Sequence, residues 1–349
     1  MSDGRSLVYL VTGGCGFLGR HLLGVTLEKE KRVCEIRLFD KVVDPRLTDF
    51  LFCDGRTVVT VLQGDITDYL SVREAVRGAD VVFHSASLVD VWHKVSPAVI
   101  HAVNVTGTEN VIQACVELGV QYLVYTSSME VVGPNVKGDP FIRGNEETPY
   151  NIAHAMPYPR SKAEAERIVV RANGTEVPHG LYTLIKTTMT PPIPVIIQHP
   201  LSPGVCVSPS LGNVAWMHLL AARGLMEEPQ TVGGQAYFCY DDSPYKSYED
   251  FNLQFLSAFG FSQVHIPLVA LWFLAVLNDV LRWVLRPVWQ WAPLLNRYTL
   301  AVACTSFTVS SDKARRHFRY TPLFSWEECR ARTQAWVDTF PGLGAKKDS

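Results

Sequence analysis

The chain has little charge, and neither sign is in excess. Only 19% of its 349 residues are charged, and 32 Lys and Arg against 34 Asp and Glu leave a formal net charge of −2. A nucleic-acid-binding surface needs a concentration of positive charge, because contacts to phosphates supply most of the affinity. The composition therefore gives no support for a nucleic-acid partner.

The eight cysteines lack the spacing of a metal site or a disulfide framework. They form no Cys-x-x-Cys pair, and no histidines stand at zinc-ligand spacing from them. The first apolar run begins at Leu7, which leaves no room for a cleaved signal peptide. We therefore expect reduced thiols in a reducing compartment. The glycosylation sequons at Asn104 and Asn173 are interpreted as chance matches.

No apolar run reaches the roughly 20 residues that a membrane-spanning helix needs. The most apolar block is 266–291, in which 266–277 is almost wholly apolar and tryptophans and arginines follow. Such side chains suit the membrane–water interface. The block predicts either membrane association, which we favour, or a buried helix of a substrate-binding lobe.

A glycine-rich turn follows the first apolar run and is the most informative motif present. Its sequence is Thr-Gly-Gly-Cys-Gly-Phe-Leu-Gly at 12–19, and a helical pattern begins within it. Gly13 permits the tight turn, Gly16 lets the backbone approach a pyrophosphate, and Gly19 lets helix and strand pack closely. Phosphates can then meet amides at the helix N-terminus. The predicted dinucleotide contacts here are Gly13, Gly16, Phe17, Leu18 and Gly19.

Further candidates for cofactor binding follow the next predicted strands. The run 33–39 ends in Asp40, whose carboxylate can bind ribose hydroxyls and repels a 2′-phosphate, so NAD is favoured over NADP. Asp65 and Ile66 follow the third strand, and Asp65 can equally meet the adenine edge or cap a helix. Ala86 follows the fourth strand, where small residues let the cofactor cross the sheet edge.

Short apolar runs alternate with amphipathic helical patterns over residues 7–130. This alternation predicts an α/β fold with a Rossmann-type, doubly wound parallel sheet and a smaller C-terminal substrate lobe. The expected segments are an NAD-binding domain at 7–185, an atypical proline-rich segment at 186–213, and a lobe at 214–340. Expected strands are 7–11, 35–39, 58–63, 81–84 and 122–126, and the longest helical pattern is 97–118.

Tyr158 and Lys162 stand four residues apart at the start of a predicted helix, so they share one helix face. A free tyrosine has a pKa of about 10, which must fall if the phenol is to act as the base in alcohol oxidation. A neighbouring ammonium and a positive nicotinamide ring can together lower it. The fifth strand ends in Thr-Ser-Ser at 126–128, which places a hydroxyl at the carboxyl edge of the sheet.

Together, these motifs resemble those of the 3β-hydroxysteroid dehydrogenase/Δ5-4 isomerase family of extended short-chain dehydrogenases/reductases. The resemblance rests on TGGCGFLG, the strand ending in Asp40, YTSSMEVVGPN at 125–135, YPRSK at 158–162 and the apolar block. It covers residues 7 to about 182 and 213 to about 338. Segments 237–252 and 298–314 are most similar to the branch that acts on C27 steroids in bile-acid synthesis.

The resemblance implies an enzyme of the endoplasmic-reticulum membrane, with its active domain on the cytoplasmic side and a possible homo-oligomeric state. Such an enzyme uses NAD to oxidise the 3β-hydroxyl of a Δ5-sterol and then moves the double bond to the 4,5 position. It implies Tyr158 as proton acceptor, Lys162 as its activator and Ser128 as the group that holds the sterol oxygen. The matching candidates for the isomerase acid/base, which can equally be a cap and turn formers, are Glu130, Asp241 and Asp242.

The sequence departs from the family pattern at 186–213. There the family has an Arg-Pro-x-Gly-Ile-Tyr-Gly loop that closes over the nicotinamide, whereas this chain has six prolines and no charged residue after Lys186. Prolines at this density exclude helix and interrupt sheet. We hypothesise an alternative transcript or a faulty gene model. The missing loop leaves open a catalytically impaired NAD-binding variant. A sugar-nucleotide epimerase-like enzyme of the same superfamily is a further alternative, against which the apolar block at 266–291 argues.

Overall fold

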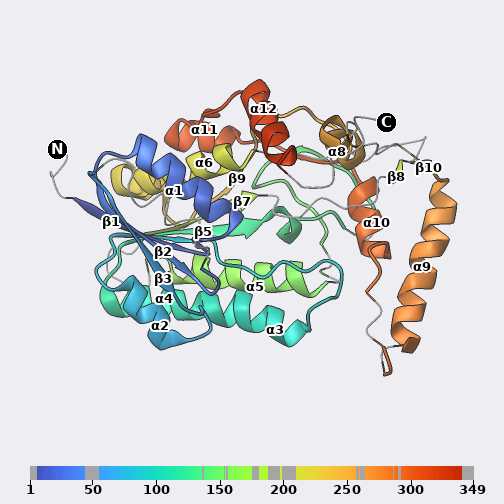
Figure 1. Cartoon of the computed structure of the whole chain (residues 1–349), viewed down its shortest axis with the longest axis horizontal. Helices are drawn as coiled ribbons and strands as arrows, with labels where there is room; N and C mark the ends of the chain where they lie inside the picture. Colours follow the sequence, from blue (N-terminus) through green and yellow to red (C-terminus); the bar gives the residue numbers. More distant parts are fainter. Residues whose placement is uncertain are drawn as a thin grey trace.

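A computed structural model of the protein describes residues 6–43, 55–135, 137–152, 154, 156–174, 181–187, 197–198, 210–256, 259, 264–285, 287–289 and 292–339. Its centre is a parallel sheet of seven strands with helices on both faces (Figure 1). The strands are β1 (Leu7–Thr12), β2 (Val33–Asp40), β3 (Val58–Gln63), β4 (Val81–His84), β5 (Tyr122–Ser128), β7 (Leu181–Thr187) and β9 (Ala236–Phe238).

The order of the strands confirms the predicted Rossmann-type, doubly wound fold. The order is β3-β2-β1-β4-β5-β7-β9, and every neighbouring pair is parallel. The chain winds outward in one direction from β1 and in the other from β4. Ligands of such sheets bind beyond the carboxyl ends of the strands, beside the point where the winding reverses.

Each face of the sheet has its own apolar core. Along β1, Tyr9 and Val11 join the cluster on one face and Leu10 joins the cluster on the other, because successive side chains of a strand point to opposite faces. Burial on both faces explains the continuous apolar runs that marked the strands in the sequence. The helices on the first face are α1 (Phe17–Lys29) and α6 (Leu211–Glu227), and those on the second are α2 (Tyr69–Val76), α4 (Gly107–Leu118) and α5 (Pro157–Ala172) (Figure 1).

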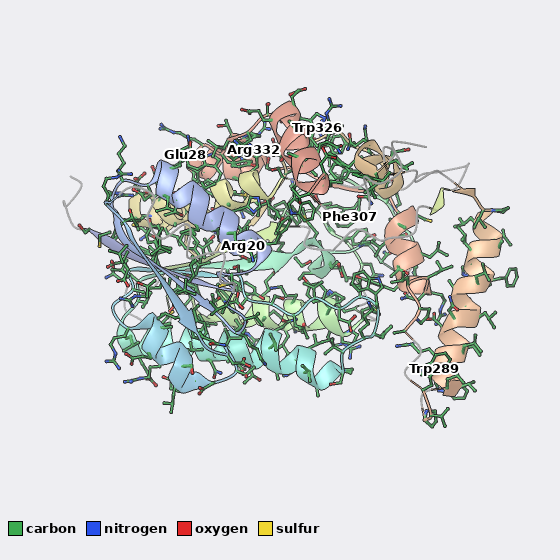
Figure 2. The ribbon with its side chains drawn as sticks, in the orientation of Figure 1. Arg20, Glu28, Trp289, Phe307, Trp326 and Arg332 are labelled. Carbon is green, nitrogen blue, oxygen red and sulfur yellow. The ribbon has the colours of Figure 1, made fainter. Side chains whose placement is uncertain are left out.

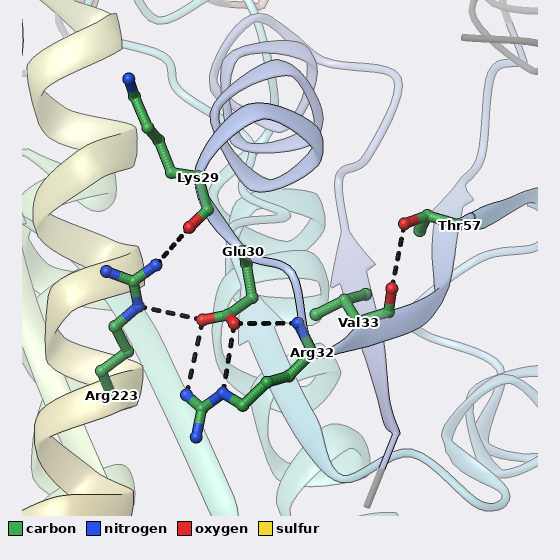
Figure 3. Close-up of polar contacts among 6 residues, drawn as sticks. All are labelled: Lys29, Glu30, Arg32, Val33, Thr57 and Arg223. Atoms are coloured by element: carbon green, nitrogen blue, oxygen red, sulfur yellow. Dashed lines mark hydrogen bonds and ion pairs between the residues drawn. The ribbon is translucent and has the colours of Figure 1, made fainter. Parts of the chain in front are cut away.

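The sheet extends beyond the expected domain boundary at residue 185. Strand β9 pairs with β7, and α6 packs against α1. Both β9 and α6 therefore belong to the sheet domain, although they lie beyond residue 185 in the sequence. An ion-pair cluster strengthens this contact (Figure 3). Arg223 of α6 donates from Nε to Glu30 Oε2 over 2.9 Å, and Arg32 Nε donates to Glu30 Oε1 over 3.2 Å. A strand as short as β9 carries too little pattern to be assigned to a sheet from sequence.

The predicted helix at 97–118 is divided by a wider turn. Helix α3 (Pro97–His101) leads into a π-helical turn, η2 (Ala102–Thr106), and then into α4. Ser96 caps the start, since its Oγ accepts a hydrogen bond from Val99 N at 3.4 Å. At the other end Gly119 adopts a φ of 69°, which a glycine tolerates without strain. π-turns of this kind are frequent at functional sites.

Helix α9 (Leu268–Leu285) lies at the edge of the molecule, apart from the sheet (Figures 1 and 2). Only Leu271 and Ala275 of this helix are buried, whereas Phe273 is 62% and Trp283 76% exposed. Among the described residues it is the one helix long and apolar enough to cross a membrane. The alternative of a buried helix in the substrate lobe is therefore wrong for 268–285, because most of its apolar surface faces outward.

The remaining elements surround the carboxyl end of the sheet or cover its first face. Helix α10 (Arg297–Cys304) packs against α9, and α12 (Trp326–Val337) packs against α8 (Tyr248–Leu256). Strand β6 (Phe141–Gly144) pairs with β11 (Phe307–Val309). Strand β8 (Ile197–Gln198), which is part of the proline-rich segment, pairs with β10 (Val264–His265). Positions 188–196 and 199–209 of that segment lie outside the described residues. The bounds of the other elements are η3 (Met129–Val131), α7 (Pro229–Val232) and α11 (Asp312–Phe318).

Candidate active site

The glycine-rich turn lies at the carboxyl end of β1 and leaves no room for a side chain at Gly13 or Gly19. Gly13 has a φ of 70°, and a Cβ on it would lie 2.9 Å from the backbone N and Cα of Ala86. A Cβ on Gly19 would lie 2.4 Å from the carbonyl oxygen of Gly13. Gly16 is the N-cap of α1, so the amides of Phe17 and Leu18 belong to the first turn, where helices leave N–H groups without intrahelical partners. This cradle fits a pyrophosphate.

Asp40 lies next to this cradle. Its Oδ2 accepts a hydrogen bond from Cys15 N at 3.0 Å, and its Oδ1 accepts one from Val42 N at 3.2 Å. The carboxylate at the end of β2 is therefore held beside the glycine turn, where the adenosine ribose of a dinucleotide would lie. These contacts fit the predicted preference for NAD.

The other predicted cofactor residues border the same edge. Asp65 forms an ion pair with Lys41 over 2.8 Å, and it accepts hydrogen bonds from the backbone and hydroxyl of Thr67, each 2.9 Å long. The N-cap of α2 is Asp68, so Asp65 stabilises the preceding turn and does not cap the helix. Ile66 is buried against Gly107, and Ala86 donates its N–H to the hydroxyl of Thr12 over 3.3 Å.

Tyr158, Ser128 and Lys162 are brought together at the carboxyl end of β5. Tyr158 lies in the first turn of α5, where Pro157 is tolerated because its missing amide has no helical partner. Its hydroxyl forms hydrogen bonds with Ser128 and Ser87. Lys162 donates from Nζ to the carbonyl of Thr126 over 2.7 Å, which ties it to the same strand end. All three predicted side chains are almost fully buried.

Burial dominates the electrostatics of this group. Burial, with a further contribution from the negative charge of Glu130, raises the pKa of Tyr158 above its ordinary value, although its bonds to Ser128 and Ser87 oppose the rise. Burial lowers the pKa of Lys162 to about 7, against the opposing influence of Glu166. The protein alone therefore does not make the phenol acidic.

Asn104 was not recognised from the sequence as part of this site. It lies in η2 with 2% of its surface exposed. Its Oδ1 accepts from Ser87 Oγ at 3.1 Å, and its Nδ2 donates to Ser161 Oγ over 2.9 Å. A buried amide with these bonds cannot receive a glycan, which agrees with the chance interpretation of its sequon. The sequence signal that could have identified Asn104 is that it is a polar residue in the middle of an apolar helical pattern.

The three isomerase candidates have different surroundings. Glu130 is buried two residues beyond Ser128, and its negative charge contributes to the raised pKa of Tyr158. Asp241 is also buried, but its carboxylate accepts hydrogen bonds from Ser210 N, Asn213 Nδ2 and Ser243 N, as a turn former would. Asp242 is exposed, 3.8 Å from Arg315. Glu130 is the candidate that the structure brings to the tyrosine.

A model of the 3-beta hydroxysteroid dehydrogenase/isomerase family matches residues 10–193 and 209–270. The chain belongs to this family. It is 50% identical to the 3 beta-hydroxysteroid dehydrogenase type 7 of Homo sapiens over 372 residues, with 98% of each protein covered. It is 38% identical to the 3 beta-hydroxysteroid dehydrogenase/Delta 5-->4-isomerase of Vaccinia virus (strain Western Reserve) over 352 residues, with 95% of the chain and 99% of the viral protein covered.

The comparison with solved structures confirms the fold. A crystal structure of UDP-galactose 4-epimerase superposes with a TM-score of 0.66 at 17% identity, covering 96% of this chain and 100% of the epimerase. At that identity the likeness is one of fold alone.

The family comparison also marks the departure in the proline-rich segment. The family model leaves residues 194–208 unmatched. The alignment with the human relative spans 372 residues, more than the 349 of this chain, so the human protein has residues with no counterpart here. The residues that the family model leaves unmatched therefore lie within the segment whose composition was atypical.

Proposed function

We propose that this protein oxidises the 3β-hydroxyl of a Δ5-sterol with NAD. The observation that carries the proposal is the hydrogen-bonded group of Tyr158 and Ser128 at the carboxyl end of β5, on the same sheet edge as the glycine cradle. Membership of the 3-beta hydroxysteroid dehydrogenase/isomerase family supports the substrate class.

The residues at the carboxyl edge hold the cofactor by backbone shape and one carboxylate. The glycine turn would receive the pyrophosphate and Asp40 the adenosine ribose, with Asp65, Ile66 and Ala86 bordering the adenosine side. NAD, when bound, supplies the acceptor for the hydride that leaves the sterol carbon. Tyr158 is almost fully buried, and the side chains around it would exclude water from the reacting groups.

In this mechanism Tyr158 takes the proton of the sterol hydroxyl while Ser128 hydrogen-bonds the same oxygen. Lys162, with a pKa near 7, can be an ammonium in the loaded site, where positive charge stabilises a phenolate. Asn104 anchors Ser87 and Ser161, and Ser161 donates to the carbonyl of Tyr158 over 2.7 Å. These bonds fix the tyrosine from both its hydroxyl and its backbone.

We extend the proposal to the second step and to the sterol itself. Glu130 is proposed as the acid/base that moves the double bond from the 5,6 to the 4,5 position, since it is the candidate beside Tyr158. A C27 sterol is proposed because segments 237–252 and 298–314 are similar to the C27 branch of the family.

The exposed apolar surface of α9 supports a membrane location. We propose that α9 and the following tryptophans sit in the membrane of the endoplasmic reticulum, with the sheet domain on the cytoplasmic side. Val288 and Trp289, just beyond α9, are also exposed, as residues of an interfacial belt would be (Figure 2). In this arrangement, segment 214–340 supplies the substrate lobe in addition to completing the sheet.

A second candidate is a variant that binds NAD but turns over poorly, which the unmatched residues 194–208 favour. The deciding experiment is NADH formation by the detergent-solubilised protein with a 3β-hydroxy-Δ5-C27 sterol, with C19 and C21 sterols as competitors. Turnover that Tyr158→Phe abolishes supports the dehydrogenase. NAD binding without turnover of any of these sterols would contradict it and support the impaired variant.

A further inference from the structure

A tyrosine from a distant part of the chain reaches the proposed acid/base. Tyr298 of α10 donates from its hydroxyl to Glu130 Oε2 over 2.5 Å, across a sequence separation of 168 residues. Glu130 itself is 6% exposed and lies in η3, directly after β5. A hydrogen bond to a charged acceptor in a buried position is among the stronger polar interactions in proteins. The orientation of this carboxylate therefore depends on a residue outside the sheet.

Glu130 is also tied to the dehydrogenase group from the other side. Its backbone N–H donates to Ser128 Oγ over 3.2 Å, and its charge acts on Tyr158. The sterol C3 oxygen is proposed to bind Tyr158 and Ser128, so the neighbouring C4 and C6 carbons would lie close to Glu130. The carboxylate is held between the oxygen-binding group and Tyr298.

The helix that carries Tyr298 is fixed in turn to α9. Leu300 of α10 packs in one apolar cluster with Leu271 and Ala275 of α9. Arg297 Nε donates to Asp279 Oδ2 over 2.8 Å, and a capping box between Asn296 and Thr299 defines the start of α10. Tyr298 thus joins the active-site carboxylate to the helix proposed to contact the membrane.

We propose that Tyr298 is a positioning residue for the isomerase step: its hydroxyl orients the Glu130 carboxylate toward C4 and C6 of the sterol. This rests on the proposed function. Glu130 removes a proton from C4 of the Δ5-3-ketone, and the C–H electron pair forms a C3–C4 double bond as the carbonyl oxygen becomes an enolate. The C3 carbonyl then re-forms, a C4–C5 double bond replaces C5–C6, and the proton is delivered to C6. No oxidant or reductant is consumed.

The test separates the two reactions by using two substrates. Isomerisation is measured from the absorbance of the conjugated ketone formed from a Δ5-3-ketosteroid, and dehydrogenation from NADH formed with the 3β-hydroxy-Δ5-sterol. Tyr298→Phe should lower the isomerase kcat by about 10- to 100-fold, the value of a hydrogen bond to a charged group, with KM and dehydrogenase kcat/KM nearly unchanged. In a Glu130→Gln background, Tyr298→Phe should cause no further loss.

Tyr150→Phe provides the matched control. This substitution also removes a tyrosine hydroxyl that donates a hydrogen bond, but the acceptor is the backbone carbonyl of Asp139 and not Glu130. Equal losses in both reactions for Tyr298→Phe, or a loss matched by Tyr150→Phe, would show a general structural role and overturn the proposal. An unchanged isomerase rate, or a wild-type protein that oxidises the sterol without isomerising it, would also overturn it. Isomerisation without dehydrogenation would instead contradict the proposed oxidation while leaving the role of Tyr298 measurable.

Discussion

The two ends of the candidate site are built by different means. At the cofactor end, shape is set by the backbone of one short segment, where glycines leave no space for a side chain beside Ala86. At the substrate end, side chains from distant segments meet, as Tyr298 meets Glu130 and Ser161 meets Asn104. A local motif can specify the first arrangement, whereas only the completed fold produces the second.

The largest expected effect is at the substrate end. Tyr158→Phe should lower kcat for sterol oxidation by about 1,000-fold, because a positioned base contributes roughly 100- to 10,000-fold. The Kd for NAD should stay within a few fold, since the glycine turn and Asp40 are untouched. NADH formation and equilibrium binding of NAD measure the two quantities. A parallel loss of both would mean that the two ends are not independent.

This difference also explains how much of the site could be predicted. The glycines, Asp40 and the Tyr158–Lys162 pair were found because each belongs to a pattern within one element. Ser87 and Tyr298 were missed because their partners are remote in sequence. The burial that raises the pKa of Tyr158 could not be read from the sequence either, because it depends on segments that meet only in the fold.

The fold shows the same difference between elements that carry a local sequence pattern and elements that depend on distant neighbours. Strands at 58–63 and 81–84 matched their predicted bounds, and β1, β2 and β5 were longer by one to three residues. Strand β9 and helix α6, which lie beyond the expected boundary at 185, join the sheet and its cover through contacts with β7 and α1. Continuous apolar runs mark central strands in the sequence, but a short edge strand is specified mainly by its neighbour.

The second prediction tests whether the exposed face of α9, the helix that packs against the helix carrying Tyr298, contacts the membrane. Replacing Phe273 and Trp283 together by serine should lower binding to phosphatidylcholine vesicles by about 100-fold, if each ring contributes about 1.5 kcal/mol on burial in the interface. Co-sedimentation with vesicles measures this. Leu70→Ser is the control, since Leu70 is 73% exposed on α2, away from α9. Unchanged binding of the double variant would contradict the membrane proposal for α9.

The third prediction concerns the backbone-defined end. Gly13→Ala should raise the Kd for NAD by about 50-fold. A side chain at a φ of 70° is strained by about 1–3 kcal/mol and its Cβ would meet Ala86, so the turn would leave the conformation that receives the pyrophosphate. Gly24→Ala is the matched control, since a Cβ at Gly24 meets nothing within 4 Å. If Gly13→Ala bound NAD as the wild-type protein does, the cradle would not be the pyrophosphate site.

The smallest effect is expected at the opposite edge of the sheet, where Glu30 should influence stability and leave both ends of the site unchanged. Burial opposes ionisation of Glu30, but hydrogen bonds from Arg32 and Arg223 outweigh it and hold its pKa below the ordinary value (Figure 3). The unfolded chain therefore binds a proton more readily than the folded one. This stabilisation is complete above a pH of about 4.3 and is lost as the pH falls below it.

Glu30→Gln should accordingly lower the free energy of unfolding by about 1.5 kcal/mol at pH 7, with a smaller difference from the wild-type protein at pH 3.5. Denaturant unfolding at the two pH values measures this difference. Glu35→Gln is the comparison, because Glu35 pairs with Arg37 in a more exposed position and should contribute less. A difference that does not shrink on acidification would mean that packing of the Glu30 side chain, and not its charge, joins α6 to the first half of the sheet.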